Sequence, residues 1–181
     1  MQRLPLLILG ILLVFGGAQA GEEQREQHPQ PSTDPRFEFL KSLEGTWTGP
    51  PLSEGMPEGV YEFHVTAGGH AVEEREMVGT PMEMVTLYHM RGKELVATHY
   101  CMLGNQPRLK ASEQVVDRTL SFACAGTPGN AASHDEEHVH GWSMQLGEDG
   151  QLRYKAELVK AGQVTHAPDM VLTRSRQTAS R

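Results

Sequence analysis

Histidines are concentrated in the segment HDEEHVHGWSMQL, residues 134–146. Two of them, His138 and His140, are two residues apart, and side chains two apart on a β-strand share a face. That face also carries Trp142 and Met144, so we expect it to be the apolar one and to point into the protein core. Neutral imidazoles ligate zinc in tetrahedral geometry. The pair therefore predicts a metal site, if another strand supplies a third ligand.

We predict that this third ligand is His99, which lies in the alternating segment 94–103. Glu136, His134 and Cys101 are reserve ligands. The alternative is that the histidine pair belongs to a hydrogen-bonded polar interior, because a buried polar group without a partner costs about 1–3 kcal/mol.

The same interior could hold a small molecule, because a small β-barrel can enclose one small apolar ligand. The residues that we expect to contact such a ligand are Tyr88, His99, Trp142 and Tyr154. Tyr88, His99 and His140 around a cavity could also carry out general acid–base chemistry. A cavity enzyme is therefore the alternative class, although the sequence contains no G-x-S-x-G, H-E-x-x-H or P-loop motif.

Strands must position these side chains, and beyond Gly45 the apolar pattern has a period of two, interrupted by turn residues at short intervals. Many short strands at regular spacing favour an antiparallel sandwich or barrel. We predict an all-β barrel of about ten strands, near residues 45–49, 59–66, 70–78, 82–90, 94–103, 108–116, 119–124, 137–147, 151–160 and 163–173.

A short helix precedes the first predicted strand. Asp34 can cap it, and Pro35 suits its first position. Phe37, Leu40 and Leu43 then recur on one helical face, which we expect to cover an end of the barrel.

The N-terminal segment predicts export. Arg3, an apolar run and the small residues Ala18 and Ala20 are typical of a secretory signal peptide, cleaved near Ala20–Gly21. The mature protein would be secreted or periplasmic. We divide the chain into a signal peptide (1–20), a disordered linker (21–34), a barrel domain (35–175) and a disordered tail (176–181).

The net charge and the cysteines give further expectations about binding partners and about a disulfide. The formal net charge of −7 argues against nucleic acid, whose phosphates demand Lys and Arg. We also expect no membrane span and leave the oligomeric state open. Cys101 and Cys124 are the two cysteines, and in an oxidising compartment such a pair often forms a disulfide. The alternative is two small buried hydrophobic residues.

Two parts of the sequence resemble known barrels. The opening LEGTWTG (43–49) resembles that of calycin-type barrels, in which a G-x-W places a tryptophan across the closed end. It is also similar, more weakly, to the G-x-W-[ST]-G-x-G of nitrobindin-like barrels, with Pro51 in place of the last glycine. Segments 84–111 and 122–130, together with HVHGW, resemble a family of secreted bacterial lipocalin-like proteins without an assigned function.

These likenesses imply a lipocalin-like binding protein for a small apolar molecule or a metal ion, zinc being a possible cofactor. The nitrobindin likeness implies haem instead, held by one histidine on a late strand, where this chain has His166. The replaced glycine and the nearby Pro168 depart from the haem-binding pattern.

Overall fold

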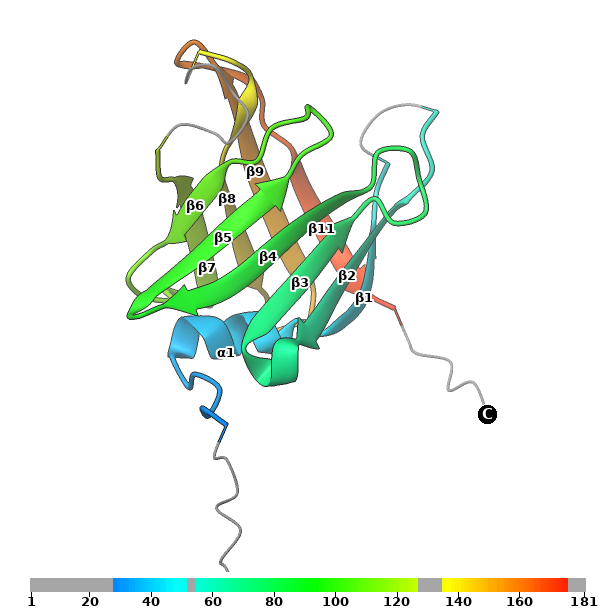
Figure 1. Cartoon of the computed structure of the whole chain (residues 1–181). Coiled ribbons are helices and arrows are strands. Elements are labelled where there is room, and N and C mark those ends of the chain that lie inside the picture. Colours follow the sequence, from blue (N-terminus) through cyan, green and yellow to red (C-terminus); the bar gives the residue numbers. More distant parts are fainter. Residues whose placement is uncertain (1–27, 52–54, 127–134, 176–181) are drawn as a thin grey trace, which may run out of the picture.

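The structure, a computed structural model, describes residues 28–51, 55–126 and 135–175. In this part of the chain eleven strands form one antiparallel sheet, and ten of them close into a barrel (Figure 1). This confirms the predicted all-β barrel with one short helix near its N-terminus. The proposed signal peptide, the first half of the proposed linker and the proposed tail lie outside the described residues.

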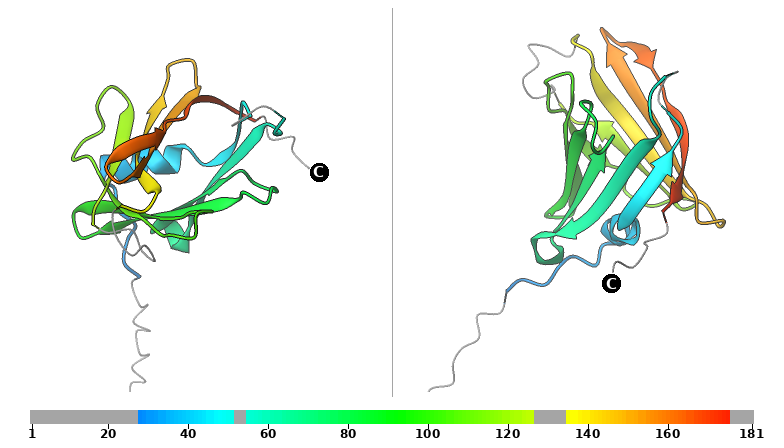
Figure 2. Two further views of the ribbon diagram at one scale, coloured as in Figure 1. Left: turned by 90° about the horizontal axis from the view of Figure 1, so that it is seen from above. Right: turned by 90° about the vertical axis from the view of Figure 1, so that its right-hand side faces the viewer.

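The elements follow one another in chain order. They are α1 (Pro35–Ser42), β1 (Gly45–Gly49), β2 (Gly59–Thr66), the 3-10 turn η1 (Ala67–Gly69), β3 (Ala71–Glu76), β4 (Met84–Arg91), β5 (Glu94–Tyr100), β6 (Arg108–Ala111), β7 (Thr119–Cys124), β8 (His138–Leu146), β9 (Leu152–Lys160), β10 (Gln163–His166) and β11 (Asp169–Arg174). Each strand from β1 to β9 pairs with the next along the chain. The barrel closes because β11 pairs with both β9 and β1, and the two views of Figure 2 show the sheet curling round to bring β11 beside β1.

The last predicted strand, 163–173, is divided in two in the structure. β10 and β11 both pair with β9, but Ala167 and Pro168 separate them. Proline has no N–H to give to a strand ladder, which accounts for the break. Its carbonyl still accepts a hydrogen bond from the Ala156 amide at 3.1 Å, so the two halves continue along one edge of β9.

The helix α1 lies across one end of the barrel (Figure 1). Phe37, Leu40 and Leu43 have no exposed surface, which confirms the predicted apolar face. Trp47 is equally buried, and its indole N–H donates to the Leu43 carbonyl at 2.8 Å. Together these groups close this end of the barrel. Among the described residues, no helix has the length and apolar composition needed to cross a membrane.

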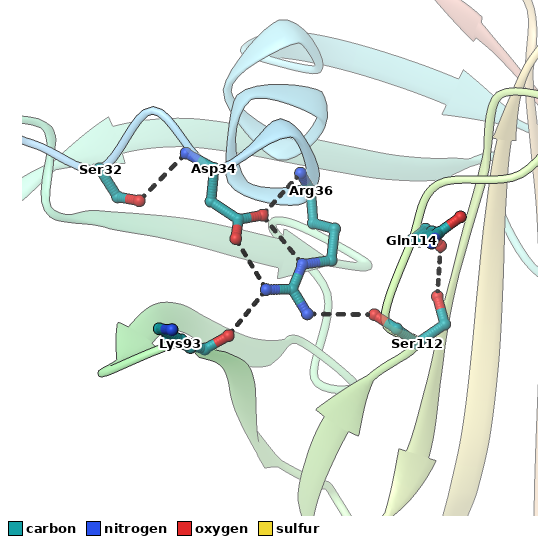
Figure 3. A network of polar contacts seen from close by, with 6 residues as sticks. All are labelled: Ser32, Asp34, Arg36, Lys93, Ser112 and Gln114. Atoms are coloured by element: carbon teal, nitrogen blue, oxygen red, sulfur yellow. Dashed lines mark hydrogen bonds and ion pairs between the residues drawn. The ribbon is translucent and has the colours of Figure 1, made fainter.

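Arg36 fastens α1 to the barrel (Figure 3). The Asp34 side chain caps the helix by accepting from the Arg36 amide at 3.0 Å, and it also accepts from the Arg36 guanidinium at 2.7 Å. The same guanidinium donates to the carbonyls of Lys93 (2.8 Å) and Ser112 (3.3 Å). Arg36 is only 9% exposed. Its fork of donors therefore ties the helix to two loops of the barrel.

Candidate functional site

A cavity of about 180 Å³ lies inside the barrel, at the end opposite α1. Arg36 of the helix binds Lys93, directly before β5, whereas the cavity reaches Met84 at the start of β4 and 101–103 beyond the end of β5. Its lining is mainly apolar and rich in methionine, with Met77, Met84, Leu103, Val139, Leu158 and Met170. Polar side chains also reach it, among them Tyr61, Glu76, His99, Tyr154 and His166.

Strand β3 places two carboxyl groups inside the barrel. Its sequence AVEERE alternates so that Glu74 and Glu76 follow the inward-facing Val72, while Glu73 and Arg75 point away. Glu74 is fully buried and Glu76 is 8% exposed. Burying a carboxylate costs much free energy, so the neutral acid is favoured there. The mainly apolar interior therefore contains two carboxyl groups, both from β3.

Glu74 lies deepest and is bound by a tyrosine. The Tyr88 hydroxyl donates to Glu74, and the Tyr88 ring packs 5.2 Å from Phe122 and 6.1 Å from Trp142 between ring centroids. Burial, followed by the charge of Glu76, raises the pKa of Glu74 well above its ordinary value, although the Tyr88 and Tyr154 hydroxyls oppose the rise. Burial therefore favours the neutral acid form of Glu74 over the charged form.

Glu76 faces the cavity and orients His99. The Thr86 hydroxyl donates to Glu76 Oε1 at 3.5 Å and lies 2.8 Å from His99 Nδ1. Glu76 Oε1 is itself 3.4 Å from the same ring nitrogen. Because two oxygens that can accept face Nδ1, we assign the ring proton to this atom. The other nitrogen, Nε2, then carries a lone pair.

Burial sets the protonation of this pair. It raises the pKa of Glu76 to about 7 and lowers the pKa of His99 to about 4. The imidazole is therefore neutral at neutral pH. His99 Nε2 is buried and has no hydrogen-bond partner among the described residues. It is an acceptor in the cavity wall to which no described residue donates a hydrogen bond.

Three of the four predicted ligand-contacting residues line the cavity: His99, Trp142 and Tyr154. The fourth, Tyr88, lies behind the cavity wall, bound to Glu74. The β4–β5 register explains why Tyr88 and His99 nevertheless share the interior. Arg91 pairs with Glu94 across the hairpin, so Thr86 falls opposite His99.

Neither His138 nor His140 lines this cavity, where the prediction placed them beside Trp142, although His138 is buried. The residue of β8 that lines the cavity ahead of Trp142 is Val139. In the pairing with β9, Val139 matches Leu158 and Gly141 matches Glu157, so His140 is an extra residue in a β-bulge. A bulge places two residues opposite one and breaks the alternation on which the prediction relied.

Gly141 permits this bulge. A Cβ at this position would lie 2.8 Å from the Phe122 carbonyl oxygen of β7. Only a residue without a side chain allows the two backbones to approach so closely. The groups predicted for acid–base catalysis are therefore divided: His99 lines the cavity, Tyr88 lies behind its wall, and His140 lies elsewhere.

The two histidines lie together, but their third neighbour is Cys124 at the end of β7, not His99. Candidate ligand atoms of Cys124, His138 and His140 all lie within 4.8 Å of one another. His99 is instead held by Thr86 and Glu76 inside the barrel. Among the reserve ligands, Cys101 lines the cavity and His134 lies outside the described residues. Glu136 meets the histidine pair through its backbone carbonyl oxygen, which lies 2.8 Å from His138 Nδ1.

The predicted disulfide does not form in the structure, where both cysteines are free thiols. Cys101 follows β5 and lines the interior cavity, whereas Cys124 ends β7 beside the histidine pair. Burial raises the pKa of both thiols. The proposed haem ligand, His166, lies on β10 and contributes to the cavity lining from an exposed position.

The sequence reasoning missed the two buried carboxyl groups. The strand at 70–78 was predicted, and its alternation from Val72 placed Glu74 and Glu76 on one face, but acidic residues are almost never buried without a partner. Their partners, Tyr88, Thr86 and His99, come from β4 and β5, and only the pairing of the strands brings them together.

Comparison of the chain with protein-family models and with curated proteins gave no match.

Proposed function

We propose that this protein is an exported, lipocalin-like carrier that binds one small, mainly apolar molecule at the open end of its barrel. The observation that carries the proposal is His99 Nε2, a buried acceptor without a partner, in the wall of an apolar cavity. A buried polar atom of this kind costs about 1–3 kcal/mol unless something bonds to it. A ligand with an O–H or N–H group would remove that cost.

The geometry around His99 favours recognition of a donor. Glu76 and Thr86 hold the Nδ1 side of the ring, which directs the lone pair of Nε2 toward the ligand. The low pKa of His99, about 4, keeps the ring neutral, so that an anionic ligand gains no countercharge from it. The Glu76 carboxyl would repel such an anion further when it ionises.

The size of the cavity limits the ligand. An engineered apolar cavity of about 150 Å³ holds benzene, and this cavity measures about 180 Å³. One ring with a short substituent therefore fits. For a ligand of roughly ten heavy atoms, the attainable affinity of about −0.3 to −1.5 kcal/mol per atom allows dissociation constants in the micromolar range.

Binding of 4-ethylphenol and of its methyl ether, 4-ethylanisole, tests the proposal. The two probes share the ring and differ in the O–H donor, so we expect the phenol to bind about tenfold more tightly, as one hydrogen bond of about 1.4 kcal/mol requires. NMR titration would measure both affinities. The preference should disappear in His99→Phe, which keeps a ring but removes Nε2, and should persist in His64→Phe, an exposed histidine on β2.

Equal affinity of the wild-type protein for the two probes would contradict recognition by His99. Failure of both probes to bind at millimolar concentration would contradict a carrier of ring-sized ligands. Retention of the phenol preference in His99→Phe would show that another group supplies the acceptor.

A further inference from the structure

The cluster of Cys124, His138 and His140 lies outside the cavity just described and has no part in the proposed function. We infer that these three side chains form a binding site for a divalent transition-metal ion of the zinc type. One thiolate and two neutral imidazoles form a donor set that zinc favours.

The separation of the two imidazoles fits a shared ion. His138 Nε2 and His140 Nδ1 are 3.2 Å apart. Zinc–nitrogen bonds of about 2.0–2.1 Å at tetrahedral angles place two nitrogens roughly 3.3–3.4 Å apart. The third donor, the Cys124 sulfur, and one ring nitrogen of each histidine all lie within 4.8 Å of one another. An ion between the three would therefore require only small side-chain movements.

A second hydrogen bond orients the first ligand. His138 Nδ1 lies 2.8 Å from the Glu136 carbonyl oxygen, which can only accept, so this nitrogen carries the proton. The lone pair of His138 is then on Nε2, the atom that faces His140. Metal-bound histidines commonly donate their other ring N–H to a backbone carbonyl in this way, which fixes the tautomer and the direction of the ring.

The β-bulge supplies the second ligand. The extra residue of β8 in its pairing with β9 is His140, and on the other side of β8 Gly141 pairs with Ala123, the residue before Cys124. This brings the end of β7 beside the two histidines. Burial also suits an exchangeable ion, because His138 is buried, Cys124 is half-buried, and His140 is more accessible than His138.

The protons balance on binding. Without the ion, the 3.2 Å contact places a proton on His140 Nδ1, which donates to His138 Nε2. When the ion binds, His140 takes its other neutral tautomer, with the proton on Nε2, so this ring releases no proton. The Cys124 thiol loses its proton to solvent as the metal–sulfur bond forms. One proton is therefore released per ion.

Cobalt(II) is a suitable probe because a cobalt–thiolate bond gives a charge-transfer band in the near ultraviolet, which an all-nitrogen site lacks. Full-length mature protein without a histidine tag, kept reduced by a phosphine, would be titrated with cobalt(II) and then with zinc(II). We expect one equivalent of cobalt to bind with the thiolate band, and zinc to displace it.

Variants identify the ligands. Cys124→Ser should abolish the band, while Cys101→Ser, a matched control in the cavity wall, should keep it. His140→Ala should weaken zinc binding at least about 100-fold, since loss of a mere outer-shell partner costs about 10–100-fold. Circular dichroism of the metal-free variants would show that each retains the barrel.

The inference would be overturned by a band that survives in Cys124→Ser, by a band that is lost in Cys101→Ser, or by failure of the wild-type protein to bind zinc at micromolar concentration. Because His99→Phe leaves all three ligands in place, it should bind zinc normally. The metal-site inference and the proposed carrier function can therefore be refuted independently of each other.

Discussion

Substitution of Glu76 by glutamine should change how stability depends on pH. Burial raises the pKa of Glu76 from 4.5 to about 7. Between these values the folded protein retains the proton that the unfolded chain has lost, so the stability of the wild-type protein falls as pH rises. The stabilisation that Glu76 adds to the free energy of unfolding is fully present below pH 4.5 and is lost as pH rises through about 7.

The size of the effect follows from the shift. A difference of about 2.5 pH units at about 1.4 kcal/mol per unit amounts to about 3 kcal/mol. Glutamine has nearly the same shape and does not ionise. The free energy of unfolding of Glu76→Gln, relative to that of the wild-type protein, should therefore rise by about 3 kcal/mol between pH 4.5 and about pH 8. Removing the Glu76 charge also lowers the pKa of Glu74, which acts in the same direction.

Urea unfolding followed by the fluorescence of the buried Trp47 and Trp142 would measure this difference at each pH. Comparing variant with wild type cancels the groups that titrate in both and lie away from Glu76. Glu73→Gln, on the outward face of the same strand, is the matched control and should show little pH-dependent difference. A difference for Glu76→Gln that stays constant across this range would refute the argument that a buried, ionisable carboxyl group faces the cavity.

Two further predictions concern the framework. Arg36→Met keeps the aliphatic stem but removes the donors to Lys93 and Ser112. Hydrogen bonds to charged groups contribute about 1.5–3 kcal/mol each, so urea unfolding should show a free energy of unfolding lower by about 3 kcal/mol. A loss below about 0.5 kcal/mol would show that the helix is held by its apolar face alone. Gly141→Ala should cost about 1–3 kcal/mol, because its Cβ would lie 2.8 Å from the Phe122 carbonyl oxygen, and it should also weaken cobalt binding by moving His140. Unchanged stability and unchanged cobalt affinity would mean that the bulge tolerates a side chain.

The sequence predicts local structure well wherever one rule applies to a whole segment. β1 and β2 begin and end where the period-two pattern places them, and the capped, one-sided helix covers an end of the barrel as expected. These features depend on neighbouring residues, so an amino-acid sequence contains the information that specifies them.

The candidate sites depended on contacts between strands. Alternation alone predicted that His138 and His140 face the interior, but a bulge at His140, permitted by the close approach of Gly141 to Phe122, turned the pair toward Cys124. Register determines which side chains meet, and a single extra residue reverses the face of every side chain beyond it.

By itself, the sequence determined that this chain forms an antiparallel barrel closed by a short helix, because hydrophobic periodicity and turn residues act over a few positions at a time. The tertiary structure alone decided that Glu76 orients His99 beside a cavity and that Cys124 joins the histidine pair. Those groups are far apart in the chain, and both the pKa values and the geometry of such sites come from burial and from partners that only the closed sheet provides.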